Sequence, residues 1–598
     1  MTSPPERTVS AGRRRLLLLL HLLLFTLAMG LFSWALEAAD PAELGGNGLL
    51  DVLPPQFYVV LLLLVLGFVL AVTGPRPAVP LLVLYTLGLI ALLHGTVPIL
   101  FEEPRYPWTY KHIAATELIA ATGRAHPTVD IYNNWPGFFA LNAWFSDALR
   151  VEPLEYARWA QPFFAVVGFG AAVFALRGFS ADSRTVFAAG WLFVVANWVG
   201  QEYFAPQASA FVLALVIVGL VSRGTPADAD FRGPRLRRIV APFDRLGARL
   251  TRTERSEPHS PTPPRLPGNA MLALAGVCWV GLVLTHQLSP IFVLAWVAAF
   301  ALLTGRMPLW IPAVAAVVQV VWILQALPWL VDNVDFLSPD VASSARPKGA
   351  GDAGLRGQEV AKYAQLAVMG LLVAVAAAGA WFRIRAGRWE PALYALVLIP
   401  ALVATVQRYG GEGPLRAYLF ALPFLALLVV SACTRHGQLR RLRYGVVALL
   451  VAAAAPLAVF GLELAHRVPP EDLRIAAWVE RNIPSDAARV YPSEASVRQL
   501  TADYARLTDA PVLRLSLYER YLGRRWDRAT VSLIESDLRE FSVRQGYVIL
   551  TPGQENYFEL YGLVPSGSFE GLRDALTEAP GFTLAHRDGA ARVFRWTP

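Results

Sequence analysis

Runs of apolar residues long enough to cross a bilayer recur along most of this chain. A membrane-spanning helix needs about 20 consecutive apolar residues, and 55% of the 598 residues are hydrophobic while 16% are charged. A backbone in lipid must satisfy its own hydrogen bonds, so each run predicts a helix. The fold class is therefore a polytopic α-helical membrane protein. We predict thirteen spans, at 16–36, 57–73, 79–97, 157–177, 185–200, 207–222, 270–286, 289–305, 309–330, 362–382, 390–407, 416–434 and 444–464.

The shorter runs, such as 185–200, also fit re-entrant helices, which would change the number of spans by about one or two. The first run resembles a signal peptide, but no convincing small-residue cleavage site follows it, so we interpret it as an anchor. Cys278 falls within a predicted span and Cys433 at a predicted cytoplasmic helix end. Neither position suits an extracellular disulfide or a metal site.

Basic residues predict which side of the membrane each loop occupies, because Lys and Arg concentrate in short cytoplasmic loops. They precede the first span and then recur on alternate loops, which puts residues 1–13 in the cytoplasm and residues 465–598 outside the plasma membrane. The arginines that carry this pattern are Arg13, Arg14, Arg15, Arg76, Arg177, Arg184, Arg306, Arg383, Arg385, Arg388, Arg435, Arg440, Arg441 and Arg443.

The segment 223–268 is rich in Arg, Pro and Ser and falls on the same cytoplasmic side. Its composition cannot build a packed core, so we expect it to be disordered or to lie on the anionic lipids of the inner leaflet. The net charge of +8 is then mainly a signal of topology. No nucleic-acid partner is needed to explain it.

The longest loop between spans, 98–156, belongs to the outer side. It opens with Glu102, Glu103 and Arg105. We predict two helices in it, one at 111–122 and one around 138–149, both rich in aromatic and apolar residues and suited to the membrane interface. They would form a platform over the bundle.

The other outer turns are short and polar. Ionisable groups near a bilayer are costly unless they meet a partner or a water-filled cavity, so several at one depth indicate a functional site. The candidate residues in these turns are Glu202, Tyr203 and Gln207, then His286 and Gln287, and finally Arg408, Glu412 and Arg416.

Each candidate taken alone also has a structural explanation. Glu102 and Glu103 suit a solvated loop with Arg105 as an exposed partner. A lone histidine such as His286 often only bonds to nearby backbone. Glu202 and Gln207 suit the cap of a helix that begins at Pro206, and Arg416 suits a side chain reaching for lipid headgroups. Their common side favours the functional interpretation.

Together these features resemble the GT-C superfamily, the polytopic glycosyltransferases that use polyprenyl-phosphate-linked sugars, and an actinobacterial member suits the Arg- and Ala-rich composition. The resemblance rests on Glu102-Glu103 and its long loop, on the turns YFAPQ, THQLSP and GEGPLRAYLF, and on the C-terminal outer region. In most of that superfamily the acidic motif lies in the first outer loop and contains Asp. Asp40 and Glu43, in the first outer loop 37–56, are therefore rivals.

The resemblance implies transfer of a sugar from a polyprenyl-phosphate donor to a glycan, lipid or protein acceptor of the cell envelope. Such transfer needs a base for the acceptor hydroxyl and cationic groups for the departing phosphate. We predict Glu102 or Glu103 as the base, Arg408 and Arg416 as phosphate ligands, and His286 with Gln287 as orienting groups. The glutamate pair alternatively holds a divalent cation, Mg²⁺ or Mn²⁺, together with water and phosphate oxygens.

Residues 465–598 change to a soluble pattern and predict a small α/β domain. Helices are expected at PPEDLRIAAWVERNIP and SFEGLRDALTEAP, strands at RVYP and GYVIL, and a hairpin turning at Asp588-Gly589. The segment PGQENYFELYG, with Gln554, Glu555, Tyr557 and Tyr561, suits either stacking on a sugar or packing within the domain, and we favour a domain that caps the bundle.

Two rival functions share these features. A polymerase or ligase of lipid-linked glycans would also use an outward-facing site with arginines, but on an oligosaccharide donor. A lipid-linked glycan flippase or transporter would carry charged residues near the bilayer midplane, where this chain has few. A non-enzymatic scaffold would not require the polar outer turns.

Overall fold

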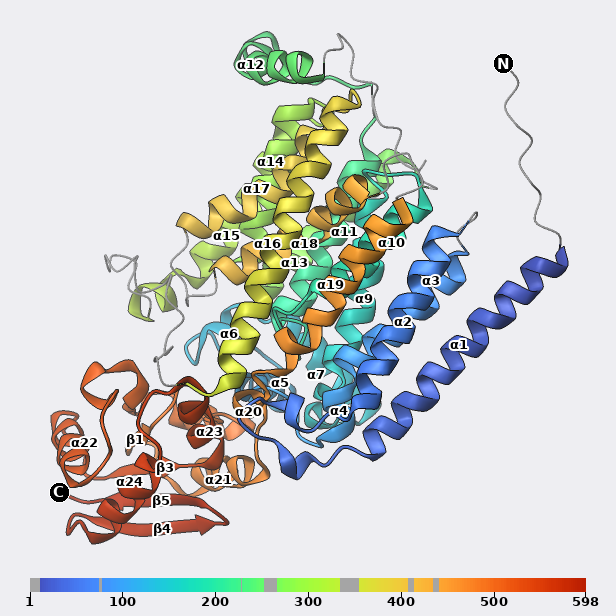
Figure 1. Cartoon of the computed structure of the whole chain (residues 1–598). Helices are drawn as coiled ribbons and strands as arrows, with labels where there is room; N and C mark the ends of the chain where they lie inside the picture. Colours follow the sequence, from blue (N-terminus) through green and yellow to red (C-terminus); the bar gives the residue numbers. More distant parts are fainter. Residues whose placement is uncertain are drawn as a thin grey trace, which may run out of the picture.

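The computed structural model describes residues 11–74, 78–226, 228–251, 266–333, 354–406, 413–433 and 440–598. It consists of a tall bundle of apolar helices with an α/β domain seated at one end (Figure 1). Each of the thirteen predicted spans coincides with an apolar helix. The fold class predicted from the sequence, a polytopic helical membrane protein, is confirmed.

Within the described ranges, eight helices are long and apolar enough to cross a membrane. They are α1 (Ala11–Glu37), α2 (Pro55–Thr73), α11 (Pro206–Gly224), α13 (Gly268–Thr285), α15 (Trp310–Asn333), α16 (Arg356–Arg385), α18 (Gly413–Cys433) and α19 (Arg440–Phe460). Shorter apolar helices occupy the other predicted windows, namely α3 (Val79–His94), α9 (Ala160–Leu176), α10 (Ser183–Ala196), α14 (Ser289–Thr304) and α17 (Pro391–Val406).

Close helix packing in the bundle depends on small residues. α16 lies directly against α18, and a Cβ atom at Gly379 would collide with the carbonyl of Leu428. Small side chains let two apolar helices approach until their backbones touch, which is how helices gain contact in a lipid environment. Both α18 and α19 pack against α16.

The two ends of the bundle differ (Figure 1). One end, called here the cavity end, carries α4 (Thr96–Leu100), α5 (Pro107–Thr122), α6 (Ile131–Asn134), α7 (Gly137–Leu149), α8 (Pro153–Ala157) and the C-terminal domain. The opposite end carries α12 (Pro234–Thr251). The long loop and the C-terminal domain therefore share an end, and the basic helix α12 lies at the other.

The two helices predicted in the long loop are present, but only one suits the membrane interface. α7 exposes Leu141, Trp144 and Leu149, as an interfacial helix should. α5 is buried instead, between α7 and a 3₁₀ helix of the C-terminal domain at Ala502–Leu507. Its run of small alanines lets neighbours pack on both faces, so the prediction of an interfacial position was wrong for α5.

The basic segment is more ordered than predicted. Residues Pro234–Thr251 form the amphipathic helix α12, which meets the bundle where Gly247 lies against Trp389. Ile239, Phe243 and Leu246 lie three and four residues apart on one exposed face. A helix with this face and flanking arginines suits the membrane surface. Residues 252–265 of the segment lie outside the described residues.

The C-terminal domain contains a mixed five-stranded sheet in the order β2-β1-β3-β5-β4. β1 is parallel to β2 and β3, whereas β5 is antiparallel to β3 and β4. The predicted hairpin is present, and Gly589 in its turn has a φ of 53°, a conformation that favours glycine. The strands are β1 (Ala488–Tyr491), β2 (Val512–Arg514), β3 (Gly546–Leu550), β4 (Phe582–Asp588) and β5 (Ala591–Trp596), and the helices are α21 (Pro470–Asn482), α22 (Arg528–Glu540), α23 (Pro552–Tyr561) and α24 (Ser568–Glu578).

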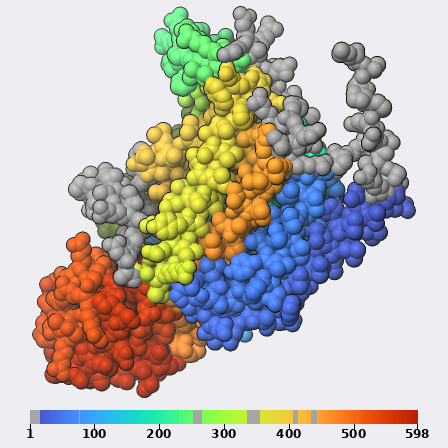
Figure 2. All heavy atoms as spheres, in the orientation of Figure 1, coloured from blue at the N-terminus to red at the C-terminus, as the bar shows by residue number. Residues whose placement is uncertain are grey.

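Backbone hydrogen bonds join this domain to the bundle. The N–H of Leu355, just before α16, donates to the carbonyl of Leu560 in α23, and the N–H of Tyr106 donates to the carbonyl of His466. His466 ends the short helix α20 (Glu463–His466), which follows α19. In the space-filling view the domain forms a separate mass against the cavity end, away from α12 (Figure 2).

Candidate active site

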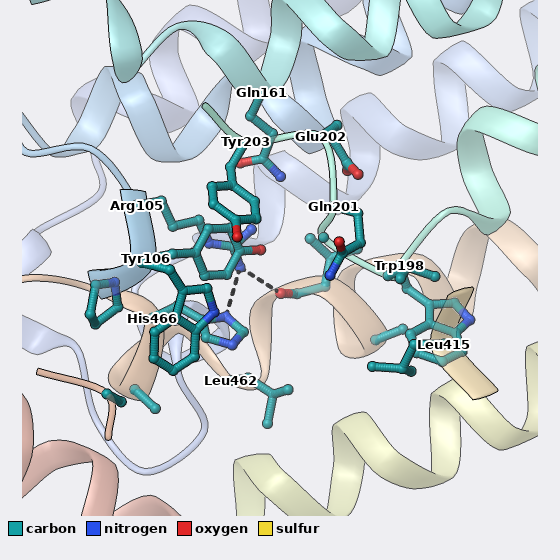
Figure 3. A pocket seen from close by; sticks show the side chains of 18 of the residues that line it. Arg105, Tyr106, Gln161, Trp198, Gln201, Glu202, Tyr203, Leu415, Leu462 and His466 are labelled. Carbon is teal, nitrogen blue, oxygen red and sulfur yellow. Dashed lines mark hydrogen bonds between the residues drawn. The ribbon is translucent and has the colours of Figure 1, made fainter. Parts of the chain in front are cut away.

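A cavity of about 250 Å³ lies where the bundle meets the C-terminal domain (Figure 3). It is called the main cavity below. Its walls come from the beginning of the long loop, the turn between α10 and α11, the region from α19 to α20, and α23. The polar and aromatic residues that line it are Arg105, Tyr106, Trp108, Gln161, Asn197, Trp198, Gln201, Glu202, Tyr203, Gln365, His466, Tyr557 and Tyr561.

The turn between α10 and α11 depends on Gly200. Its φ is 69°, which is unfavourable for a residue with a side chain. A Cβ atom at this position would also lie 2.5 Å from the hydroxyl oxygen of Tyr106. Gly200 therefore lets the turn pass close to Tyr106 and delivers Gln201 and Glu202 to the main cavity.

Among the described residues that line the main cavity, Glu202 is the one with a carboxylate side chain. Its Oε1 lies 3.2 Å from Nδ1 of His94, and its Oε2 accepts a hydrogen bond from the amide of Asn197 at 3.3 Å. Burial alone would raise the pKa of Glu202, but the contact with His94, supported by Arg105, outweighs it and holds the pKa below the usual value. Glu202 is therefore ionised at neutral pH.

Arg105 is the cation of the main cavity. Its Nε donates to Oε1 of Glu463 at 3.1 Å, and its Nη2 lies 2.5 Å from Oε2 of the same carboxylate. Nη2 also donates to the carbonyl of Val459 at 3.0 Å. These contacts use Nε and Nη2, and no hydrogen bond joins Nη1 to another described residue. The ion pair thus holds the guanidinium in place while Nη1 keeps donors for a ligand.

His466 is a neutral imidazole of fixed tautomer. Nη2 of Arg105 lies 3.3 Å from its Nδ1, a contact marked in Figure 3. Because a guanidinium only donates, Nδ1 must accept, and the ring proton sits on Nε2. Burial, together with the charge of Arg105, lowers the pKa of His466 well below its ordinary value. His466 therefore brings a hydrogen-bond donor, without a charge, to the cavity wall.

Amides and aromatic rings make up most of the remaining wall. Oδ1 of Asn197 and Oε1 of Gln201 are buried and have no hydrogen-bond partner among the described residues. Tyr106 and Tyr203 lie with their ring centroids 5.1 Å apart. Buried polar atoms usually find partners, so these two amide oxygens are suited to accept hydrogen bonds from a ligand.

Tyr106 itself has an unusual backbone. Its φ is 72°, and a bulky residue in this region is strained. The strain is held by the hydrogen bond from its N–H to His466 and by the buried ion pair of its neighbour Arg105. Strained residues fixed by their surroundings concentrate at functional sites.

A small apolar pocket of about 20 Å³, called the crevice below, adjoins the main cavity within the bundle. It is lined by Asn197, Gln201 and Glu202, which also line the main cavity. The rest of its wall comes from α3, α9, α10, α11 and α18 and is mostly apolar, with Phe164, Gly168, Phe193, Phe211, Val212 and Leu419 among its residues. The polar main cavity thus adjoins the apolar crevice between membrane helices.

The structure brings together some of the residues predicted from the sequence. Arg105, Glu202 and Tyr203 line the main cavity, and Gln207 donates to the hydroxyl of Tyr203 at 2.7 Å. Glu103 lines a small adjoining pocket that shares Arg105 and Tyr203 with the main cavity.

Other predicted residues lie elsewhere. Glu102 is exposed and lines none of the described pockets. His286 is buried, and its Nδ1 accepts from the N–H groups of Leu288 and Ser289, so it caps the start of α14. Gln287 is half-buried and does not line the main cavity.

The late arginine-containing turn is described only in part. Arg416 is half-buried in the first turn of α18, next to Leu415, which lines the main cavity. Arg416 and His286 lie close enough to interact electrostatically. Arg408 and Glu412 lie outside the described residues.

The rival acidic residues of the first outer loop do not reach the main cavity. The side chain of Asp40 accepts from the N–H of Ala42 at 2.9 Å, a local cap. Glu43 belongs to the same short 3₁₀ helix. Neither lines the main cavity among the described residues.

Sequence reasoning missed several residues of the site, including His94, which contacts Glu202 and lines the crevice. Gln161 and Gln365 also went unnoticed, although both interrupt predicted spans. Polar residues inside an apolar span are costly and usually functional, so this signal was present. Glu463 falls within the last predicted span, 444–464, and carried the same signal, whereas His466 follows that span and gave none.

A resident metal ion would need ligands that the described residues do not supply. Within them, no group of three His, Cys, Asp or Glu side chains is close enough to hold one. Glu102 and Glu103 are the residues that the sequence favoured for a cation. A cation held there would take its remaining ligands from water and substrate oxygens.

Fold and site define a polytopic membrane protein with a polar chamber enclosed between its helices and a C-terminal α/β domain. No protein-family model matches the sequence, and no curated protein matches it. Similar solved structures do exist. ArnT from Cupriavidus metallidurans bound to undecaprenyl phosphate is 14% identical with a TM-score of 0.44, and the match covers 86% of this chain and 97% of that chain.

The arabinofuranosyltransferase AftD from Mycobacteria is 12% identical with a TM-score of 0.40, covering 87% of this chain and 40% of that chain. TM-scores below 0.5 do not establish a common fold. The function proposed below therefore rests on the geometry of the main cavity.

Proposed function

We propose that the protein is a membrane glycosyltransferase that moves a sugar from a polyprenyl-phosphate donor to a glycan, lipid or protein acceptor of the cell envelope on the extracytoplasmic side. One observation carries this proposal: a polar chamber shares Asn197, Gln201 and Glu202 with an apolar crevice between membrane helices. A lipid-linked sugar has the same two parts, a polar head and an apolar chain. The head would occupy the main cavity and the chain would lead toward the crevice.

The charged groups suit glycosyl transfer. In this reaction an acceptor hydroxyl oxygen bonds to the anomeric carbon, the bond from that carbon to the phosphate oxygen breaks, and the hydroxyl proton goes to a base. We assign the base to Glu202, which is ionised and held by His94 and Asn197. Nη1 of Arg105 would donate to the departing phosphate, with Arg416 as a second cation near the cavity. Glu103, in the adjoining pocket, is the alternative base.

The size of the main cavity favours a single sugar over an oligosaccharide. A volume of about 250 Å³ lies just below the range of roughly 300 to 1,000 Å³ of pockets that enclose drug-sized ligands. This favours a glycosyltransferase over a ligase or polymerase of lipid-linked glycans. Arg105 and Glu202, the charged residues that line the main cavity, lie in turns between helices rather than midway along a span, which disfavours a flippase.

The test compares Glu202→Gln, Glu103→Gln and Glu102→Gln at matched expression. Transfer of labelled sugar from a panel of polyprenyl-phosphate donors is measured in membranes. The loss of a general base typically costs about 10² to 10⁴ in rate, so Glu202→Gln should lose transfer by that factor. Glu102→Gln is the matched control and should keep it, because Glu102 is exposed beside the site.

The other outcomes are equally informative. Loss in Glu103→Gln with full activity in Glu202→Gln would move the base to the adjoining pocket. Equal activity of all three variants would remove carboxylate catalysis from this cavity. A labelled oligosaccharide in the product, with no single-sugar transfer, would point to the ligase.

A further inference from the structure

α23 supplies the part of the main cavity wall that comes from the soluble domain. Tyr557 and Tyr561 lie four residues apart on one face of this helix, and both line the main cavity. Their ring centroids are 4.8 Å apart with an angle of 55° between the rings. They are called the α23 tyrosines below. Residues at this spacing share a helix face, so the pair presents a continuous aromatic surface.

Both ends of α23 are fixed. At its beginning, Thr551 and Gln554 form a capping box, and Asp472 of α21 accepts hydrogen bonds from the Thr551 hydroxyl at 2.6 Å and the Gly553 N–H at 3.1 Å. At its end, the carbonyl of Leu560 accepts from the N–H of Leu355 of the bundle. The aromatic surface is therefore held in place before any ligand arrives, which lowers the cost of binding.

The hydroxyl groups of the α23 tyrosines have no hydrogen-bond partner among the described residues, although both side chains are half-buried. Buried tyrosines normally find a partner for the hydroxyl. Burial and the nearby hydroxyl of Tyr561 raise the pKa of Tyr557. A ligand with hydroxyl groups would complete these contacts.

The position of the α23 tyrosines separates them from the donor side. The crevice that suits a lipid chain is lined by helices of the bundle, and no residue of α23 lines it. Glu202 belongs to both the crevice and the main cavity, so the reaction centre lies toward the bundle. The α23 tyrosines therefore face the reaction centre from the aqueous side.

We propose that the α23 tyrosines form the acceptor subsite, where a sugar ring of the acceptor stacks on the aromatic surface and its hydroxyl groups bond to the two phenols. The inference rests on the proposed function and adds the class of acceptor to it: a carbohydrate. Sugar rings present C–H groups on one face and hydroxyl groups at the edge. An aromatic ring with a polar tip matches both.

The test uses the full-length protein and three kinds of variant. Tyr557→Leu and Tyr561→Leu keep apolar volume against the buried cluster of Leu464, Ala465 and Leu560 on which the rings pack, but remove the flat aromatic face. Tyr557→Phe and Tyr561→Phe keep that face and remove the hydroxyl. Tyr518→Leu is the matched control, because Tyr518 is exposed on the same domain and does not line the main cavity.

Transfer is measured with the acceptor varied at saturating donor, and then with the donor varied at saturating acceptor. The stacking of a nucleobase on an aromatic side chain contributes roughly 1 to 3 kcal/mol in nucleic-acid sites. By analogy, loss of the stacking surface in the Leu variants should raise the KM for the acceptor by about tenfold or more. The KM for the donor and the binding of undecaprenyl phosphate should stay within about twofold. The KM of the Phe variants for the acceptor should lie between the values of the wild type and the Leu variants.

Two results would overturn the subsite. A rise in donor KM or a loss of undecaprenyl phosphate binding would place the tyrosines on the donor side, and unchanged kinetics in all variants would leave them a structural role only. Saturation-transfer NMR with methyl glycosides gives a second readout. If Glu202→Gln abolishes transfer while the Leu variants behave like wild type, the proposed function stands and the subsite fails. If wild type transfers no sugar, a glycoside signal lost in the Leu variants would still establish the subsite.

Discussion

Nη2 of Arg105 lies 2.5 Å from Oε2 of Glu463, and this buried pair joins the first outer residues of the long loop to the helix that leads into the C-terminal domain. Both side chains are almost inaccessible to solvent. Such a pair adds little stability over an apolar one, but losing one partner leaves the other charge buried and unpaired. The pair therefore fixes the geometry of the main cavity.

Glu463→Gln should destabilise the protein by about 3 to 5 kcal/mol, the usual cost of breaking a buried pair, and should lower transfer because the Arg105 guanidinium loses its anchor. Thermal unfolding of the detergent-solubilised protein measures the first effect. Glu578→Gln is the control, because Glu578 forms a comparably short pair with Arg528 on an exposed surface. Equal melting temperatures for the two variants would contradict the anchoring role of Glu463.

His94→Gln should shift the pH dependence of transfer. The contact with His94 is the largest influence that lowers the pKa of Glu202 against the opposing effect of burial. In wild type the acid limb of kcat/KM should therefore lie below the usual glutamate value of 4.5. Without His94 the pKa of Glu202 rises, so the limb should move to higher pH while the plateau changes less. An unmoved limb would mean that Glu202 is not the titrating base.

Gly200→Ala should abolish most transfer, because the new Cβ would lie 2.5 Å from the Tyr106 hydroxyl oxygen and the backbone has a positive φ. Tyr106→Phe removes that oxygen. The double variant Gly200→Ala, Tyr106→Phe should therefore recover part of the lost activity, apart from the backbone strain of roughly 1 kcal/mol or more. Full additivity of the two single effects would show that the contact does not matter.

Stability of the C-terminal domain should fall as pH rises from about 4 to 7. Burial raises the pKa of Asp472 to about 7 from its usual 3.8, against hydrogen bonds from Thr551 and Gly553. A raised carboxyl pKa means that the folded state binds the proton of Asp472 more tightly than the unfolded state does. The stabilisation that this proton provides is therefore complete below about pH 4 and is lost as pH passes 7.

Asp472→Asn, which has no proton to lose, should flatten this dependence and protect α23 equally at pH 5 and pH 8. Hydrogen exchange of peptides from 546–561, corrected for intrinsic rates, provides the measurement in the intact protein. Asp509→Asn serves as a control on an exposed loop of the same domain. A steep dependence that persists in Asp472→Asn would assign it to another group.

The sequence predicted the bundle well because each span is specified locally, by its own run of apolar residues. The C-terminal helices, strands and hairpin were equally local signals. The position of α5 was not specified by a local signal, because its burial depends on the 3₁₀ helix at Ala502–Leu507, far along the chain. A helix with two apolar faces suits both a lipid interface and a protein core, and only the neighbours decide.

The main cavity was predicted in part for a related reason. Arg105, Glu202 and Tyr203 could be identified because they are polar residues in outer turns. His286 has the same signal, yet its side chain caps α14, because a histidine after a helix can bond to local backbone or reach a site. Glu463, His466 and the α23 tyrosines join the cavity only through tertiary packing, which no short motif encodes.

The pairing of Arg105 with Glu463 also sets the timing of biogenesis. The two residues are separated by 358 positions, and at about 5 to 20 residues per second the ribosome needs roughly 20 to 70 s to make that stretch. Throughout this interval the guanidinium lacks its partner and must stay in contact with water or lipid headgroups. The inserting chain therefore passes through a stage in which all the helices before α19 can be in place while the chamber is still open, and its closure marks the completion of assembly.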